Sequence, residues 1–188
     1  MTSVFSTPLS DEAVLEPLEP WQAEEFLANI DRCRDLIAPW VGPSFVAADL
    51  ADARRVTRSY ADGQAADGKR LFGIRLNGKL VGGTMFVSFD TKSGVCELGC
   101  WLEPAGQGRG LVTAAASTLL DWAFEVRGLS RAEWWTVAGN EPSIKVAKRL
   151  GMSLDATLRE YDPGRDGGPR RDMLIWSILA REWRAARR

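Results

Sequence analysis

Histidine is absent from the 188-residue chain, and this absence excludes several classes of catalysis. Without an imidazole there is no Ser-His-Asp or Cys-His nucleophile system and no histidine-containing metal site. The three cysteines, Cys33, Cys96 and Cys100, are odd in number and lack metal-ligand spacing, so we expect reduced thiols and no bound metal. Any chemistry must therefore use carboxylates, hydroxyls, thiols, amides or the backbone.

The chain also lacks an excess of charge of either sign. Lys and Arg number 24 against 25 Asp and Glu, a balance that gives no signature of a nucleic-acid or membrane-surface partner. No stretch reaches the ~20 apolar residues of a membrane span, and residues 1–10 lack the pattern of a signal peptide. We therefore expect a cytoplasmic protein that acts on a small molecule or a peptide, with no nucleic-acid or membrane partner.

The length and composition fit one compact domain. With 45% of its residues hydrophobic, a chain of this size buries roughly 70% of the surface that its unfolded form exposes. A second full domain has no room. We predict a single domain over residues 1–188, with an ordered core over roughly residues 10–183.

The first third of the chain is predicted to be mostly helical. Residues 14–18 predict a short strand, and Pro20 is well placed to open a helix. A second helical stretch is expected to end near Trp40. Asp49 is suited to cap a third helix, which is expected to stop near Gly63.

Strands dominate the remainder. Two β-rich runs flank Asn77-Gly78, a strong hairpin signal, and Gly128 is suited to end a later helix. The expected elements are strands over 71–76, 79–89 and 95–102, a helix over 111–127, a strand over 131–137, a helix over 142–150, and strands near 156–161 and 172–179. This order predicts a mixed α/β domain in which hairpin strands meet a strand-loop-helix-strand crossover.

A glycine-rich loop at residues 106–110, Gly-Gln-Gly-Arg-Gly, precedes the predicted helix at Leu111. Its glycines lack Cβ atoms, so consecutive backbone N–H groups can face one concavity, and the helix N-terminus adds positive charge. These features suit a pyrophosphate, with Arg109 as a charged contact, although a tight turn without a ligand fits equally. The nucleotide P-loop pattern is absent, and the dinucleotide fingerprint needs glycine where Leu111 stands.

Three segments carry a family resemblance. The first joins residues 97–104 to residues 107–113, Gln-Gly-Arg-Gly-Leu-Val-Thr, and is similar to a Gln/Arg-x-x-Gly-x-Gly/Ala motif. The second, residues 140–152, is similar to an Asn-x-x-Ser helix that ends in Leu-Gly-Phe. The third is Leu158-Arg159 followed by residues 172–183. In these segments, and over roughly residues 14–183, the chain resembles the GNAT acetyltransferases, and among them the RimJ/RimL type that acetylates protein N-termini.

The resemblance implies a fold, a donor and a set of donor contacts. The implied fold is a single GNAT-like α/β domain with a central mixed, mostly antiparallel twisted sheet flanked by helices. The implied donor is acetyl-CoA, whose pantetheine arm would meet main-chain atoms of Cys100 and Leu102 and the side chain of Asn140. The pyrophosphate would lie against the loop residues Gln107, Gly108, Arg109, Gly110, Leu111 and Val112. Asn140 is equally suited to cap the helix that follows it.

The reaction implied is direct attack of an amine on the thioester through a tetrahedral intermediate. It needs a base, and without histidine the base must be a carboxylate or a water that a carboxylate orients. The resemblance implies Glu97 or Asp162, with Glu160 beside the latter, and each is equally open to a structural role. Ser143 is implied to act as the acid or to contact the coenzyme or its thiolate. Cys100 is expected to pack and not to act as a nucleophile.

The acceptor is expected to be a primary amine, and the N-terminal α-amine of a protein or peptide is favoured. An α-amino group titrates near 8 and a lysine near 10.4, so presenting lysine neutral at pH 7 costs roughly 3 kcal/mol more. Trp40 and Trp176 are candidates to contact the acceptor. The alternatives are a small amine such as an antibiotic or metabolite, succinyl transfer, a non-catalytic acyl-CoA-binding domain and a dinucleotide-dependent oxidoreductase. A homodimer stays an open alternative to a monomer.

Overall fold

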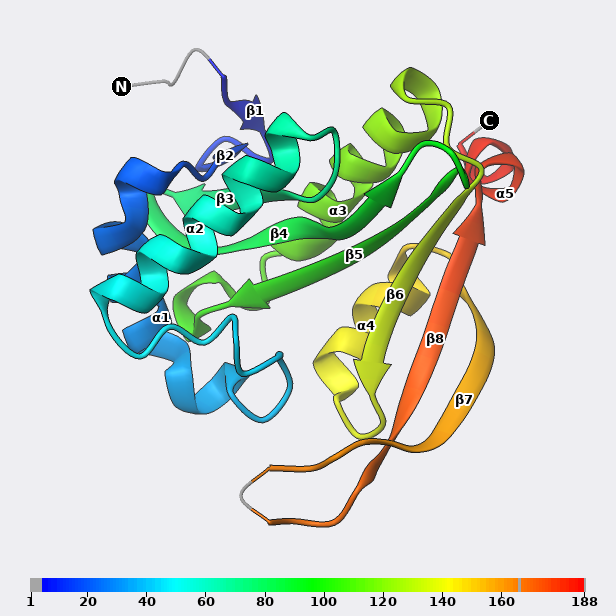
Figure 1. Cartoon of the computed structure of the whole chain (residues 1–188). Coiled ribbons are helices and arrows are strands. Elements are labelled where there is room, and N and C mark those ends of the chain that lie inside the picture. The colour runs from blue at the N-terminus through cyan, green and yellow to red at the C-terminus, as the bar shows by residue number, and fades with distance from the viewer. Residues whose placement is uncertain (1–4, 166, 188) are drawn as a thin grey trace.

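The fold is built on one eight-stranded sheet, seen in a computed structural model that describes residues 5–165 and 167–187 (Figure 1). The strand order is β1-β2-β3-β4-β5-β6-β8-β7. Only β5 and β6 pair in parallel, and all other neighbours are antiparallel. The predicted fold class, an α/β domain with a mixed, mostly antiparallel sheet flanked by helices, is therefore confirmed.

The strands are β1 (Thr7–Pro8), β2 (Ala13–Pro17), β3 (Arg70–Leu76), β4 (Lys79–Asp90), β5 (Val95–Leu102), β6 (Arg131–Val137), β7 (Ser153–Asp162) and β8 (Arg171–Leu179). The helices are α1 (Ala23–Ile37), α2 (Leu50–Ala65), α3 (Leu111–Asp121), α4 (Glu141–Arg149) and α5 (Ala180–Ala186). Within the described residues, no helix is both long and apolar enough to cross a membrane.

The prediction of two separate helical stretches before Gly42 is wrong. Pro20 opens a short 3₁₀ turn, and α1 then runs without a break to Ile37. No glycine or proline stands between Ala23 and Ile37 to interrupt the helix, and its apolar residues keep helical spacing. The predicted cap of α2 is confirmed, because the Asp49 carboxylate accepts a hydrogen bond from the Asp52 N–H at 2.9 Å.

The later turn and helix-end signals behave as expected, and two short elements were missed. Asn77 and Gly78, with φ of 49° and 80°, form the hairpin turn between β3 and β4. Gly128, with φ of 69°, follows α3 and a π-helical turn over Trp122–Val126. The two missed elements, β1 and α5, are two and seven residues long. Asp166, in the turn-rich loop predicted before β8, lies outside the described residues.

Helices cover both faces of the sheet. On one face, α1 and α2 close over a core that includes Phe26, Ile30 and Trp101. On the other, α3 and α4 close over a second core that includes Leu98 and Trp134. Successive strand residues face opposite sides, so adjacent residues of β5 contribute to different layers.

A buried polar network fixes α1 against the loop after β5. The Glu103 carboxylate, 2% exposed, accepts hydrogen bonds from Asn29 Nδ2 at 2.9 Å and from Arg32 Nε at 2.6 Å. Asn29 Oδ1 in turn accepts the indole N–H of Trp101 at 2.7 Å. Because these groups are paired, the network holds the end of β5 at a defined position beneath α1.

The sheet opens between β5 and β6. The parallel ladder ends at the pair Leu98 and Trp134, although β5 continues to Leu102 and β6 to Val137. Beyond that pair the two strands diverge, as Figure 1 shows. The main chain of each strand is therefore left without a strand partner on the side that faces this splay.

Candidate active site

A cavity of about 390 Å³ lies where the β5 end, the glycine-rich loop and α4 meet. Its lining includes most of the loop residues predicted from the sequence, together with Cys100, Leu102, Asn140 and Ser143 from the strand and helix on either side. The loop residues among them are Gln107, Gly108, Gly110, Leu111 and Val112. We call this space the donor cavity.

The loop offers backbone donors to the donor cavity. Gly108 and Gly110 have φ of 74° and 72°, a left-handed conformation that favours glycine. Among the described residues, no acceptor bonds the N–H groups from Gly108 to Thr113, which include the first turn of α3. A run of free N–H groups at a helix N-terminus is the arrangement that binds a phosphate or pyrophosphate.

Among the described residues that line the donor cavity, the positive charge comes from α4. Lys145 and Arg149 line the donor cavity, whereas Arg109 does not and lies 3.3 Å from Glu12 in an ion pair. The two cations are four residues apart, so they share one face of the helix. The sequence interpretation missed them. Their i, i+4 spacing after the predicted cap at Asn140 was the available signal.

A second cavity of about 280 Å³ adjoins the donor cavity and takes in residues from the α1–α2 layer. Its lining includes Phe45, Tyr60, Glu97, Trp135 and Thr136. The residues that line both cavities are Trp40, Val41, Cys100, Asn140 and Ser143. We call the second space the acceptor cavity, after the amine acceptor that the sequence resemblance implies, and these five shared residues the junction.

Glu97 supplies the only charge among the residues that line the acceptor cavity, within the described part of the chain. Burial, and then the nearby Glu133, raise the pKa of Glu97 to about 7. No hydrogen bond or ion pair to its carboxylate is found among the described residues. Glu133, by contrast, is held by Arg131 Nε at 2.8 Å and by the Trp135 indole at 2.9 Å. Glu97 is therefore a free carboxyl poised to exchange a proton near neutral pH.

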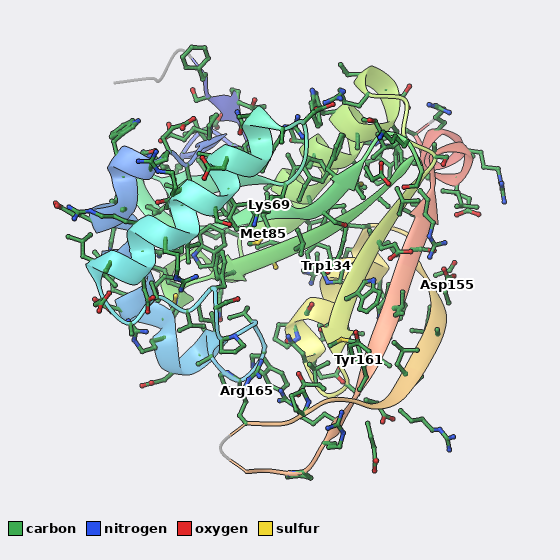
Figure 2. The ribbon with its side chains drawn as sticks, viewed as in Figure 1. Lys69, Met85, Trp134, Asp155, Tyr161 and Arg165 are labelled. Carbon is green, nitrogen blue, oxygen red and sulfur yellow. The ribbon has the colours of Figure 1, made fainter. Side chains whose placement is uncertain are left out.

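Ser143 stands at the junction with its hydroxyl oriented by a neighbour. The indole N–H of Trp134 donates to Ser143 Oγ at 2.8 Å, and Figure 2 shows Trp134 beside α4. Because this bond occupies a lone pair, the Ser143 proton is free to be donated elsewhere. Asn140 caps α4 by accepting the Ser143 N–H at 3.4 Å and also lines both cavities, so its capping role coexists with access to a ligand.

Residues 13–153 match the family model of the acetyltransferase (GNAT) domain. The chain belongs to this acetyltransferase family. It is therefore an enzyme that uses acetyl-CoA as the acyl donor. The resemblance read from the three sequence segments is confirmed.

Relatives of this acetyltransferase match over nearly the whole chain. The protein named "Putative ribosomal N-acetyltransferase YdaF" of Bacillus subtilis is 28% identical over 194 residues, which cover 96% of this chain and 98% of YdaF. The fold is also that of RimL, a ribosomal L7/L12 α-N-protein acetyltransferase solved with coenzyme A (TM-score 0.86, 13% identity, 93% and 97% coverage). It is shared with the microcin C7 self-immunity acetyltransferase MccE, solved with acetyl-CoA and AMP (TM-score 0.83, 22% identity, 94% and 97% coverage).

The cysteines of the acetyltransferase are poorly suited to nucleophilic attack. Cys100 lies at the junction, but burial raises the pKa of its thiol to about 12. Burial likewise raises the pKa of Cys96 to about 12. Both thiols stay protonated at neutral pH, and the thiolate is the reactive form. Direct transfer from donor to amine therefore suits this site better than an acyl-cysteine route.

Besides Arg109, three of the sequence candidates lie outside both cavities: Trp176, Asp162 and Glu160. Trp176 is buried under α4 in the core, with Lys148 Nζ 5.9 Å from its ring centroid. Asp162 ends β7 and forms an ion pair with Arg171 at 2.9 Å. Burial opposes ionisation of Asp162, but hydrogen bonds from Arg171 and the Gly164 N–H leave its pKa lowered. Glu160, its neighbour, is exposed and lines neither cavity.

The Asp162 ion pair instead braces one wall of the junction. Arg171 Nη2 also donates to the Pro39 carbonyl at 2.8 Å. Arg165, labelled in Figure 2, donates through Nη2 to the Val41 carbonyl at 2.9 Å. The guanidinium of Arg171 stacks 5.5 Å from the Trp40 ring centroid. The β7–β8 connection thus holds the α1–α2 connection, which carries Trp40, in place.

We expect Asp162→Asn to lower stability and to leave chemistry largely intact. The amide keeps an acceptor for the Gly164 N–H but removes the charge that pairs with Arg171, which costs about 1–3 kcal/mol. The KM for the acceptor is expected to rise about 2- to 5-fold through a looser Trp40, with kcat changed less than about 2-fold, because the Asp162 carboxyl lines neither cavity. Thermal unfolding and steady-state kinetics measure both effects. A loss of kcat above about 100-fold would contradict this expectation and would indicate that Asp162 acts as a base.

Proposed function

We propose that the enzyme transfers the acetyl group of acetyl-CoA to the N-terminal α-amine of a protein or peptide. The observation that carries this proposal is the free Glu97 carboxyl, with a pKa raised to about 7, in a cavity that joins the donor cavity at Cys100, Asn140 and Ser143. A base and an acyl donor are thereby given adjoining spaces, which is the arrangement that direct transfer needs.

The chemistry of the donor cavity supports the proposed position of the acyl donor. Free N–H groups of the loop and of the first turn of α3 suit the pyrophosphate, and Lys145 and Arg149 add charge across from them. Asn140 and the main chain of Cys100 and Leu102 suit the pantetheine amides. When bound, acetyl-CoA supplies an activated acyl thioester. With the phosphates and amides held by these partners, the thioester would lie toward the junction.

Glu97 is proposed as the base. A carboxylate with a pKa of about 7 lies roughly one unit below an α-ammonium and more than about 3 units below a lysine. Proton transfer from an α-ammonium to Glu97 therefore costs little, whereas transfer from a lysine costs roughly 5 kcal/mol. The match between base and acceptor favours the α-amine.

Ser143 is proposed as the proton donor to the departing thiolate. Its hydroxyl lies at the junction, and the Trp134 indole occupies one lone pair of the oxygen. The Ser143 proton is thus left available to the departing thiolate, and Ser143 and Glu97 line the same cavity. Direct transfer needs both a base and an acid at the reacting centre, and the two residues are proposed for these roles.

The acceptor cavity favours a neutral acyl group. No Lys or Arg lines this cavity among the described residues, and its one charge is the acidic Glu97. A succinyl carboxylate near the junction would be unpaired and would face a like charge. This supports acetyl over succinyl transfer. The name of YdaF, a ribosomal N-acetyltransferase, supports a protein acceptor.

A paired-peptide assay tests the acceptor. One peptide has a free α-amine and no lysine, and its partner has a blocked α-amine and one lysine. With acetyl-CoA, free thiol release and mass spectrometry are expected to report acetylation of the first peptide at its N-terminus. The rate on the lysine peptide is expected to be about 100-fold lower, because its amine is rarely neutral at pH 7.

The same assay separates the alternatives. Faster transfer to the lysine peptide would contradict the α-amine proposal, and transfer only to small amines would move the enzyme to antibiotic or metabolite acetylation. No thiol release above background with any acceptor would contradict the proposed function as a whole.

A further inference from the structure

Three buried side-chain polar atoms lack a hydrogen-bond partner among the described residues: Thr136 Oγ1, Arg165 Nε and Trp176 Nε1. Of these, only Thr136 lines the donor cavity or the acceptor cavity. The Thr136 residue is 4% exposed, so its hydroxyl is removed from solvent. A buried hydroxyl without a partner costs about 1–3 kcal/mol, which a protein sustains where a ligand completes the bond.

The position of Thr136 points to the donor's reacting end. It lies on β6 two residues beyond Trp134, where the parallel ladder with β5 has ended. Residues two apart on a strand share one face, so Thr136 lies on the same side as Trp134, whose indole bonds Ser143. Thr136 also lines the acceptor cavity together with Gly99 and Cys100 of the opposing strand. It is thus a polar group within the splay itself.

We propose that Thr136 is a further catalytic residue, whose hydroxyl donates a hydrogen bond to the thioester group of the acyl donor. The inference rests on the proposed placement of the pantetheine arm in the splay between β5 and β6. Negative charge grows on the thioester as the amine attacks. A hydroxyl already buried beside it, with no protein partner to give up, forms a stronger bond in the transition state than in the ground state.

Among the described residues, the Thr136 hydroxyl has no hydrogen-bond partner. The Trp134 indole, a donor, bonds to Ser143 Oγ, and Asn140 Oδ1 accepts the Ser143 N–H. The nearby Cys100 is a weak acceptor, and burial keeps its thiol protonated by raising its pKa to about 12. Within the described residues, the Thr136 hydroxyl is therefore an unpaired donor that a ligand acceptor could satisfy.

Thr136→Val tests the proposal, with Thr136→Ser as the matched control. Valine keeps the branched shape and the strand preference of threonine but removes the hydroxyl, whereas serine keeps the hydroxyl. For Thr136→Val we expect kcat to fall about 10- to 100-fold. The melting temperature without ligand is expected to stay equal or to rise, because an unpaired buried polar group is lost. Thr136→Ser is expected to keep kcat within about 3-fold of the wild type, since the donor is retained.

Ligand binding supplies a readout that does not depend on turnover. Calorimetric binding of acetyl-CoA to Thr136→Val is expected to weaken about 2- to 10-fold, the range of one hydrogen bond. Binding of desulfo-CoA, which lacks both sulfur and acyl group, is expected to be unchanged. Equal weakening for both ligands would place Thr136 elsewhere along the coenzyme and overturn the proposal.

Activity separates this proposal from the proposed function. Wild-type kcat in Thr136→Val, with an active wild-type enzyme, would overturn the role of Thr136 and leave the α-amine proposal standing. A wild-type enzyme that is inactive on every peptide would contradict the proposed α-amine acceptor. The comparison of acetyl-CoA with desulfo-CoA binding would still test Thr136. An equal loss of kcat in Thr136→Val and Thr136→Ser would show that Thr136 acts through packing and would overturn the proposal.

Discussion

Glu97→Gln is expected to lower kcat by about 10² to 10⁴, the usual contribution of a general base. Glutamine keeps the size of the side chain and its hydrogen-bonding oxygen but cannot take a proton from the ammonium of the acceptor. The wild-type rate is expected to rise with pH through about 7, where burial and Glu133 place the pKa of Glu97. The pH profile of the variant should lack this rise near pH 7 and should keep only the rise that reports deprotonation of the acceptor amine.

Glu133→Gln is the matched control for this pH profile. Glu133 lies opposite Glu97 in the register of β5 and β6 and is the second cause of its raised pKa, after burial. Arg131 keeps Asp155 as a partner at 2.7 Å when Glu133 is neutralised. We therefore expect the acid limb to move to lower pH, with the plateau rate nearly unchanged. A pH profile of Glu97→Gln that matches the wild type would contradict the assignment of the base.

The same carboxyl has a measurable cost in stability. Its pKa is raised from an ordinary 4.5 to about 7 in the folded state, so the folded protein binds more protons than the unfolded chain between those pH values. The free energy of unfolding therefore falls as pH rises through this window, by up to about 1.4 kcal/mol per pH unit. Glu97→Gln should lack this fall and be more stable than the wild type above pH 7. Urea unfolding measured across the window tests the sign.

The parts of the site that follow local rules could be predicted from the sequence. The loop glycines, the Asn140 cap and the Asn77-Gly78 hairpin depend on backbone geometry within a few residues. The same holds for the excluded classes of chemistry, since the absence of histidine needs no structure. Glu97 was found as a candidate, but its pKa depends on burial and on Glu133, which the sheet brings near it.

The parts that depend on tertiary packing could not be predicted. Thr136 could not be identified from the sequence, because its hydroxyl becomes a candidate ligand contact only through the splay of β5 from β6. Asp162 follows a segment that resembles the family. Its carboxylate, however, forms an ion pair with the guanidinium of Arg171, nine residues later. Arg109 was expected at the pyrophosphate because it stands within the loop motif. Its ion-pair partner, Glu12, lies 97 residues earlier in the sequence.

Gly110→Ala is expected to weaken coenzyme A binding by about 10- to 100-fold, the loss of one or two charge-assisted hydrogen bonds. Gly110 has φ of 72° and is the residue that opens α3. An added Cβ meets no atom within 4 Å, so the protein itself does not clash with it. The cost arises from a left-handed conformation that alanine disfavours by about 1–2 kcal/mol, and from a methyl group in the space that the phosphates need.

Gly128→Ala separates these two causes. Gly128 follows the same helix at its other end, with φ of 69°, and a Cβ there also meets nothing within 4 Å. It lines neither cavity. Both variants should lose about 1–2 kcal/mol of stability, because they carry the same backbone strain. Only Gly110→Ala should lose affinity for coenzyme A by calorimetry. Equal losses of affinity in the two variants would mean that helix stability, and not the phosphate cradle, controls donor binding.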